Sequence, residues 1–314
     1  MDDAQRHATR NLGSKSGNGQ APGPGRRLFL GGLLGAAAAA ATVGSARAAT
    51  GSAASTSAET GQTRPIPPSA IGMHLYTMRD PLARDFEGTL EKLAAIGYAT
   101  VGVSGRHGHS AADIRRMLDA TGLKAVLEHV GYDTVTGRGL PQALEDVRTL
   151  GGKWIVVPSL PSSLLSPDGY REAARKLNQA GLTARDAGLK VLFHNHEPDH
   201  RTVNGQQLYD ILLAETDPHL VGFELDLYWA AKGGAKNPAD YFNENRHRFP
   251  ALHVKDMAPN GDFADVGSGV LDFPHMFGSA RRGGVKQWLV EHDRPADPFA
   301  SARTSYEYLR DVRF

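Results

Sequence analysis

The chain alternates between short apolar runs and longer segments with helical periodicity. Apolar residues three or four positions apart predict helices over Phe86–Ile96, Ala111–Ala120, Leu140–Leu150, Gly169–Ala187 and Gly205–Ala214. The runs predicted as strands begin near Ile71, Ala99, Lys124, Trp154, Leu189, Val221, Ala251 and Gln287. Gly97, Gly122 and Gly188 each follow a predicted helix and precede a strand, as glycines that end a helix do.

This order of elements predicts eight βα units. They repeat about every 25 to 36 residues, and eight of them in about 250 residues fit a closed (β/α)8 barrel, the TIM barrel of the α/β class. An open, doubly wound sheet is the alternative for the same alternation. A glycine-rich nucleotide-binding turn would then follow the first strand, and none follows the run at Ile71. We therefore expect the barrel.

The first part of the chain has the pattern of an export signal. Residues 1–25 are polar, Arg26-Arg27 precede a run rich in Leu, Ala and Gly, and Ala46-Arg47-Ala48 places small residues at a cleavage position. This predicts a twin-arginine-type signal peptide over residues 1–48 and a periplasmic or extracellular location. The apolar run is short and Ala-rich for a membrane span, so we expect no stable membrane anchor after cleavage. An anchor that is never cleaved is the alternative.

Composition bounds the domains and partners of the remaining chain. Residues 49–68 are rich in Ser, Thr, Ala, Gly and Pro and are predicted as a flexible linker, followed by the barrel domain over residues 69–314. Without residues 1–48 the chain has 29 Lys and Arg against 32 Asp and Glu, a formal charge of −3. This near-neutral balance predicts no nucleic-acid partner. The oligomeric state stays open, and a homo-oligomer is possible.

Four of the apolar runs end in residues that bind metal ions in proteins. These residues are His194, Asp226, His253 and Glu291. In a (β/α)8 barrel the carboxyl ends of the strands form the active-site face, where strands five to eight are neighbours. The chain has no cysteine, so the ligands are nitrogen and oxygen only. Such a set suits Mn²⁺, Co²⁺, Zn²⁺ or Mg²⁺. We expect one divalent ion, with Mn²⁺ as the first choice.

Several motifs in their order along the chain resemble one known family. They are Gly72-Met-His-Leu-Tyr-Thr-Met-Arg-Asp80, His194-Asn195-His196, Leu225-Asp226-Leu-Tyr228-Trp229, His253-Val-Lys255-Asp256, Val266-Gly-Ser-Gly269-Val-Leu-Asp272-Phe and Val290-Glu291-His-Asp293. From about residue 70 to the C-terminus the sequence is similar to the sugar phosphate isomerase/epimerase family, which has a xylose isomerase-like barrel. Its members include ketose epimerases, sugar isomerases, inosose dehydratases and lyases acting on 3-keto sugars. The resemblance is specific for the fold and not for the substrate.

The resemblance implies roles for the strand-end residues. Asp226, His253 and Glu291 match the family's ligands on strands six, seven and eight. The strand-five ligand is often Glu, and here His194 takes its place. In the epimerases of the family, carboxylates on strands five and eight exchange a proton with opposite faces of the substrate. Because only Glu291 of that pair is present, one-base isomerisation or elimination gains weight.

Other residues at the same face complete the predicted site. His196, Asp199 and Lys255 are further catalytic candidates, and His129, His74, Tyr76, Trp229 and Lys255 are candidates for substrate binding. Each has a structural alternative. His129 could support a ligand, Asp199 could form the turn after Pro198, Lys255 could form a salt bridge with Asp256 or Glu224, and the aromatic residues could belong to the core.

The expected function is a metal-dependent isomerase, epimerase or lyase acting on a free sugar, glycoside or keto-sugar. The metal would polarise a substrate carbonyl, and a base, by position Glu291, would remove the neighbouring proton to give an enediolate. A non-catalytic exported sugar-binding barrel is the alternative. Endonucleases acting at abasic DNA sites share this barrel and are a remote third reading, because they need a basic groove.

Overall fold

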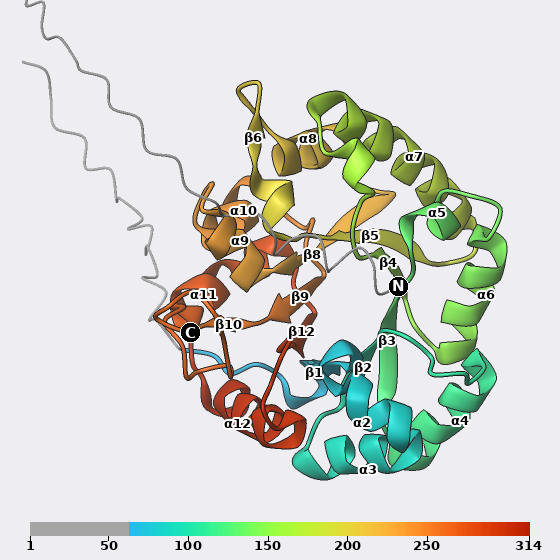
Figure 1. Cartoon of the computed structure of the whole chain (residues 1–314), viewed down its shortest axis with the longest axis vertical. Coiled ribbons are helices and arrows are strands. Elements are labelled where there is room, and N and C mark those ends of the chain that lie inside the picture. Colours follow the sequence, from blue (N-terminus) through green and yellow to red (C-terminus); the bar gives the residue numbers. More distant parts are fainter. Residues whose placement is uncertain (1–62) are drawn as a thin grey trace, which may run out of the picture. The chain divides into compact units, whose positions relative to one another are not determined.

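The computed structural model describes residues 63–314, in which eight parallel strands close into a barrel (Figure 1). The strands are β1 Ile71–His74, β2 Thr100–Val103, β3 Lys124–His129, β4 Trp154–Val157, β5 Lys190–His194, β8 Val221–Asp226, β9 Ala251–Val254 and β12 Gln287–Val290. They follow one another around the ring in chain order, and β12 pairs in parallel with β1 to close it. The predicted (β/α)8 fold is confirmed, and each predicted strand run is one barrel strand.

Helices surround the barrel between successive strands. The longer ones are α3 Phe86–Ile96, α4 Ala111–Thr121, α6 Leu140–Leu150, α7 Pro167–Asp186, α8 Leu208–Glu215, α11 Phe273–Gly283 and α12 Pro298–Asp311. Short helices are α2 Arg79–Arg84, α5 Tyr132–Val135, α9 Leu227–Gly233 and α10 Pro238–Glu244, with 3-10 turns at Pro68–Ala70, Leu75–Met78, Ser162–Leu164 and Glu197–His200. Gly97 and Gly122 are the C-cap residues of α3 and α4, and Gly188 follows the C-cap of α7.

The predicted helix over Gly205–Ala214 was wrong at its start. Thr202–Val203 (β6) and Gln206–Gln207 (β7) form an antiparallel hairpin, and helix α8 begins only at Leu208. The turn residues Asn204 and Gly205 have φ values of 52° and 73°. An Asn-Gly pair accepts this left-handed backbone, which a two-residue hairpin turn requires. A second small hairpin joins β10 Asp256–Met257 to β11 Phe263–Ala264.

The barrel interior is apolar toward the amino ends of the strands and polar at their carboxyl ends. Successive residues of a strand point to opposite faces, so every second residue points inward. The apolar interior layers are Leu127, Trp154, Val156, Leu192, Ala251 and Leu289. Two positions after Leu127, Leu192, Ala251 and Leu289, the same inward face carries His129, His194, His253 and Glu291. Strand geometry thus gathers these polar side chains at one end.

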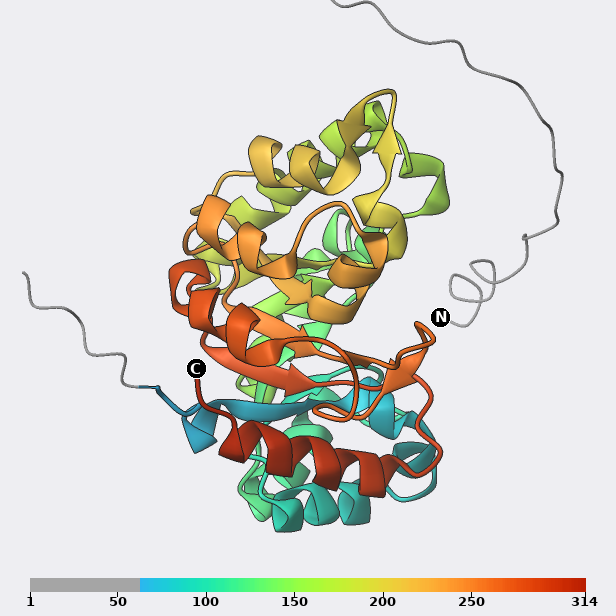
Figure 2. The ribbon, with the colours of Figure 1, turned by 90° about the vertical axis from the view of Figure 1, so that its left-hand side faces the viewer.

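The two ends of the described chain meet beside β1. The main chains of Arg64 and Phe314 exchange two hydrogen bonds, 2.8 and 3.2 Å long, and Ile66 is buried. In Figure 2, helix α12 lies against β1 and brings the C-terminus to the start of that strand. The last residues of the predicted linker, residues 49–68, therefore pack onto the barrel. The predicted signal peptide, residues 1–48, and linker residues 49–62 lie outside the described residues.

No helix within residues 63–314 has both the length and the apolar character needed to cross a bilayer.

The close packing of β1 gives a testable prediction. A Cβ atom on Gly72 would lie 2.4 Å from both Leu289 Cδ2 and Thr100 Oγ1. Gly72→Ala should therefore lower the free energy of unfolding by about 1–3 kcal/mol through overpacking, measured by urea denaturation. Gly131→Ala is the matched control, because Gly131 has an ordinary φ of −58° and open space at its Cβ position. Equal stability of the two variants would contradict the described packing.

Candidate metal centre

The four predicted ligands converge at the carboxyl ends of four adjacent strands. His194 ends β5, Asp226 ends β8, His253 lies in β9, and Glu291 follows β12. One nitrogen or oxygen atom of each lies within 4.8 Å of the others, and all four residues are at most 4% exposed. They form a compact, buried set of donors, which we call the donor set.

Glu291 has contacts to three positive or potentially positive groups. Its Oε1 accepts a hydrogen bond from His74 Nδ1 at 3.0 Å. Its Oε2 lies 2.8 Å from His253 Nδ1 and 2.8 Å from Lys255 Nζ. Burial alone would raise the pKa of this carboxyl, but Lys255 and His253 outweigh it and hold the pKa well below its ordinary value. Glu291 is therefore an anion with a fixed orientation.

Lys255 is a fully buried ammonium group among three carboxylates. Its Nζ lies 3.0 Å from Asp226 Oδ2, 2.8 Å from Glu291 Oε2 and 2.7 Å from Asp293 Oδ1. Burial opposes the charge, but Asp226 and Asp293 outweigh it and raise the pKa well above the ordinary value. Lys255 is thus a fixed positive charge at the edge of the donor set.

The salt-bridge partners suggested for Lys255 by the sequence, Asp256 and Glu224, are not the ones found. The Asp256 carboxylate accepts hydrogen bonds from the backbone N–H groups of Gly267, Gly269 and Leu271 instead. It holds the loop that contains the Val-Gly-Ser-Gly motif. Glu224 contacts histidines.

Two neighbouring residues fix the orientation of Asp226. Asn195 accepts a hydrogen bond from the Asp226 N–H at 2.9 Å and donates one to its carbonyl oxygen at 3.2 Å. The Oδ1 atom of Asp226 accepts from the N–H of Trp229 at the start of α9. The Oδ2 atom consequently points toward Lys255 and toward His253 Nδ1, which is 3.8 Å away.

The donor set fits a divalent cation by charge and by its unused donor atoms. Two buried carboxylates, Asp226 and Glu291, and the less buried Asp293 face a single lysine. His194 Nδ1 is buried and makes no hydrogen bond. Burial and nearby His253 lower the pKa of His194 well below its ordinary value, so its ring is neutral, as a ligand must be. Burial disfavours charge on His253, yet Glu224 and Glu291 raise its pKa to about 10. The site therefore attracts positive charge.

Glu224 was missed as a functional residue by the sequence analysis. It lies two residues before Asp226 on β8 and is fully buried. In the sheet it stands beside His194 of β5 on one side and apolar Ala251 of β9 on the other. The strand alternation in Val221–Asp226, with Leu225 between the two acids and Phe223 before them, was the signal that could have found it.

The remaining predicted residues lie around the donor set in different ways. The His196 ring lies 4.7 Å from the His194 ring and 5.7 Å from Trp229, and its buried Nδ1 has no hydrogen-bond partner. Lys255 Nζ lies 5.5 Å from the Trp229 ring and 5.7 Å from Phe263, an aromatic residue of β11 that the sequence analysis also missed. The His129 and His74 rings lie 4.3 Å apart inside the barrel, tilted by 47° to one another.

Asp199 and Tyr76 have contacts of their own. Both oxygens of Asp199 are used, one by the Tyr170 hydroxyl and the other by the His196 N–H, so the carboxylate shapes the turn at Glu197–His200. This is the turn-forming alternative considered above. The half-buried Tyr76 ring has the Arg79 guanidinium 4.5 Å from its centre. Burial raises the pKa of its hydroxyl, and Asp293 and Glu291 are near enough to add to this effect.

Comparison with known proteins places this barrel in a family. The family model described as "Xylose isomerase-like TIM barrel" matches residues 90–312. The chain belongs to this family.

Similar proteins differ in what their names state. An inosose dehydratase of Lacticaseibacillus casei is 22% identical over 267 residues, which cover 71% of this chain and 88% of that protein. A sugar phosphate isomerase/epimerase from Parabacteroides distasonis is 26% identical, with a TM-score of 0.69 over 77% of this chain and 98% of that one. The IOLI protein, solved with a zinc atom, is 16% identical with a TM-score of 0.59, covering 76% and 95% of the two chains. The last likeness shows the fold alone.

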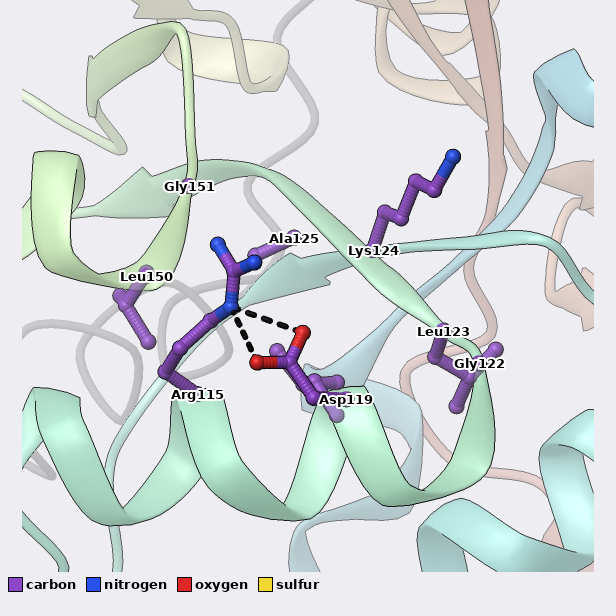
Figure 3. Close-up of a pocket in the computed structure, with 9 residues that line it drawn as sticks. Arg115, Asp119, Gly122, Leu123, Lys124, Ala125, Leu150 and Gly151 are labelled. Atoms are coloured by element: carbon purple, nitrogen blue, oxygen red, sulfur yellow. Dashed lines mark hydrogen bonds and ion pairs between the residues drawn. The ribbon is translucent and has the colours of Figure 1, made fainter.

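The opposite end of this xylose isomerase-like barrel carries a different kind of surface. A hollow there is lined by the end of α4, the start of β3 and the end of α6 (Figure 3). Its charged residues, Arg115 and Asp119, form an exposed pair with Nε–O distances of 2.9 Å. At the amino ends of barrel strands, residues contribute to stability and not to catalysis.

The burial of Lys255 predicts a large effect on stability. Lys255→Met leaves three carboxylates without their shared cation and should lower the free energy of unfolding by about 3–5 kcal/mol. Urea denaturation in the presence of a chelator measures the change. Arg115→Met is the control, because its exposed pair with Asp119 contributes at most about 1 kcal/mol. A loss as small as that of the control would show that the carboxylates do not depend on Lys255.

Proposed function

We propose that this protein is a divalent-metal-dependent enzyme acting on a sugar or keto-sugar, with a lyase or dehydratase reaction favoured over isomerisation and epimerisation. The observation that carries the proposal is the donor set at the carboxyl ends of β5, β8, β9 and β12. In (β/α)8 barrels this face holds the active site. The name of the dehydratase relative supports the choice of reaction.

His194, Asp226, His253 and Glu291 would bind the ion, with Mn²⁺ as the first choice and Co²⁺, Zn²⁺ or Mg²⁺ as alternatives. When bound, the ion would act as a Lewis acid that polarises a substrate carbonyl and so makes the adjacent C–H more acidic. Lys255 would stabilise the negative charge that develops on a substrate oxygen, because its ammonium group is buried and fixed.

Removal of the substrate proton requires one base near the donor set. Glu291, the one retained carboxylate of the epimerase pair, and His196 are our candidates. The Nδ1 atom of His196 has no hydrogen-bond partner, whereas both oxygens of Asp199 are occupied. A single base suits elimination, in which the base takes the proton from one carbon and then gives it to the hydroxyl group of the next carbon, which departs as water.

The groups around the site support a neutral, hydroxyl-rich substrate. Trp229, Phe263 and Tyr76 offer aromatic surface for the apolar face of a sugar ring, while His129 and His74 line the interior. The signal-like pattern of residues 1–48 supports export by the twin-arginine route. Because phosphorylated sugars are mostly intracellular, we favour a free sugar, glycoside or keto-sugar.

Metal content tests the first part of the proposal. The purified full-length chain should contain about one equivalent of a divalent transition metal, and the His253→Ala/Asp226→Ala variant should lose it. Elemental analysis after reloading and removal of free ions measures this. His107→Ala/Asp119→Ala changes the same residue types at exposed positions and should keep the metal. If the wild-type chain takes up no ion, a non-catalytic sugar-binding barrel becomes the better account.

Turnover tests the second part. Metal-loaded enzyme should convert a member of a panel of free sugars, 3-keto-glycosides and keto-inositols, and Glu291→Gln should lower kcat by about 10²-fold or more. Metal content of the variant must be measured beside its activity, because Glu291 belongs to both the donor set and the candidate bases. A His196→Gln variant with the larger loss would assign the base to His196 instead. Full turnover in both variants would refute both assignments.

A further inference from the structure

Glu224 contacts two histidines from inside the barrel. Its Oε2 accepts a hydrogen bond from His129 Nε2 at 2.7 Å, and its Oε1 lies 3.0 Å from His253 Nε2. The residue is fully buried and lies outside the donor set. A buried carboxyl group is costly unless partners surround it, so the contacts of Glu224 with the two histidines require an explanation.

The position of Glu224 determines which nitrogen of His253 faces the donor set. Nε2 of His253 lies on the side of Glu224, and Nδ1 lies on the side of Glu291 Oε2 and Asp226 Oδ2, 2.8 and 3.8 Å away. When an ion is bound, a carboxylate beside one ring nitrogen keeps the proton there and leaves the lone pair of the other nitrogen for the ion. The same carboxylate orients His129, which places its ring 5.4 Å from His253 and almost parallel to it.

We propose that Glu224 is a positioning residue that makes Nδ1 of His253 the metal-binding atom. It also holds the His129 ring beside the His253 ring. This inference rests on the proposed function, since it requires that the donor set bind an ion. The inference gives Glu224 a role on β8, the strand that also carries Asp226 of the donor set. It also explains why β8 carries a buried acid at a position flanked by His194 of β5 and apolar Ala251 of β9.

A second arrangement of histidines gives the competing explanation. His74, His129 and His253 also lie within 4.8 Å of one another and could hold an ion of their own, with Glu224 as a fourth ligand. That ion would be bound in addition to the ion of the donor set, and His253 would contact both. The two explanations therefore differ in stoichiometry. Ours requires one ion for each chain, and the competing explanation requires two.

The test compares Glu224→Gln with Glu128→Gln in the full-length chain. Glu128 is also a buried carboxylate on a barrel strand, but it faces outward and pairs with Arg106 at 2.6 and 2.8 Å. We expect Glu224→Gln to weaken Zn²⁺ binding about 10- to 100-fold, as changes around metal-bound histidines do. Glu128→Gln should lower stability and leave Zn²⁺ affinity unchanged. Competition with a chromophoric chelator measures the affinities.

Nitrogen NMR of the histidine rings separates positioning from a loss of negative charge. In the Zn²⁺-loaded wild-type protein, His253 should carry its proton on Nε2 and the metal on Nδ1, with its signals assigned by their absence in His253→Gln. In Glu224→Gln this pattern should be lost or mixed. A charge effect alone would weaken binding and keep the pattern. The wild-type spectrum decides the matter even where Glu224→Gln does not fold.

The outcomes distinguish this inference from the proposed function. Zn²⁺ bound through Nε2 of His253, two equivalents of Zn²⁺, or an unchanged affinity in Glu224→Gln would each overturn the role of Glu224 while the donor set stands. A charge effect with the wild-type ring pattern retained in Glu224→Gln would overturn it as well. A wild-type chain that binds none of Zn²⁺, Mn²⁺, Co²⁺ and Mg²⁺ would overturn both.

Discussion

Burial of carboxylates at the carboxyl end of the barrel is the constraint on which the rest of the site depends. A carboxylate removed from water is costly unless cations and hydrogen-bond donors surround it. Glu224, Asp226 and Glu291 are all buried, and Lys255, His253, His74 and His129 are directed at them. The orientation of nearly every polar group in the barrel interior follows from this demand. A divalent cation would satisfy it further.

The architecture was predicted well because the order of apolar and polar residues in the sequence follows the order of strands and strand ends in the barrel. Apolar runs marked the eight strands, and the residue at the end of a run marked the active-site face. Three of the four residues of the donor set, Asp226, His253 and Glu291, also matched the ligands of the family. The same rules predicted Lys255 on the side of His253, two residues away, which the structure bears out.

Other features depend on contacts that local pattern does not encode. Glu224 stands inside an apolar run, where an acid does not mark a strand end. Phe263 reaches the site only because the β10–β11 hairpin folds over it. Asp199 was assigned to chemistry from its place in the chain, but Tyr170, from a distant helix, occupies its carboxylate. Each depends on a partner far away in sequence.

Gly102 leaves room for an imidazole in the same way. It has no side chain where a Cβ would lie 2.8 Å from His74.

The hydrogen bonds between Arg64 and Phe314 have a consequence for the topology of the molecule. They bring the first and last described residues together at the amino end of β1, on the side of the barrel away from the donor set. The eight βα units form a closed ring. The covalent chain is interrupted at one place in that ring, where residues 64 and 314 lie together. Since order around the ring does not depend on where the chain is cut, a short peptide could join residues 64 and 314. New ends could then be opened in another loop at the amino end of the barrel, giving a circular permutant with the same circular order of strands.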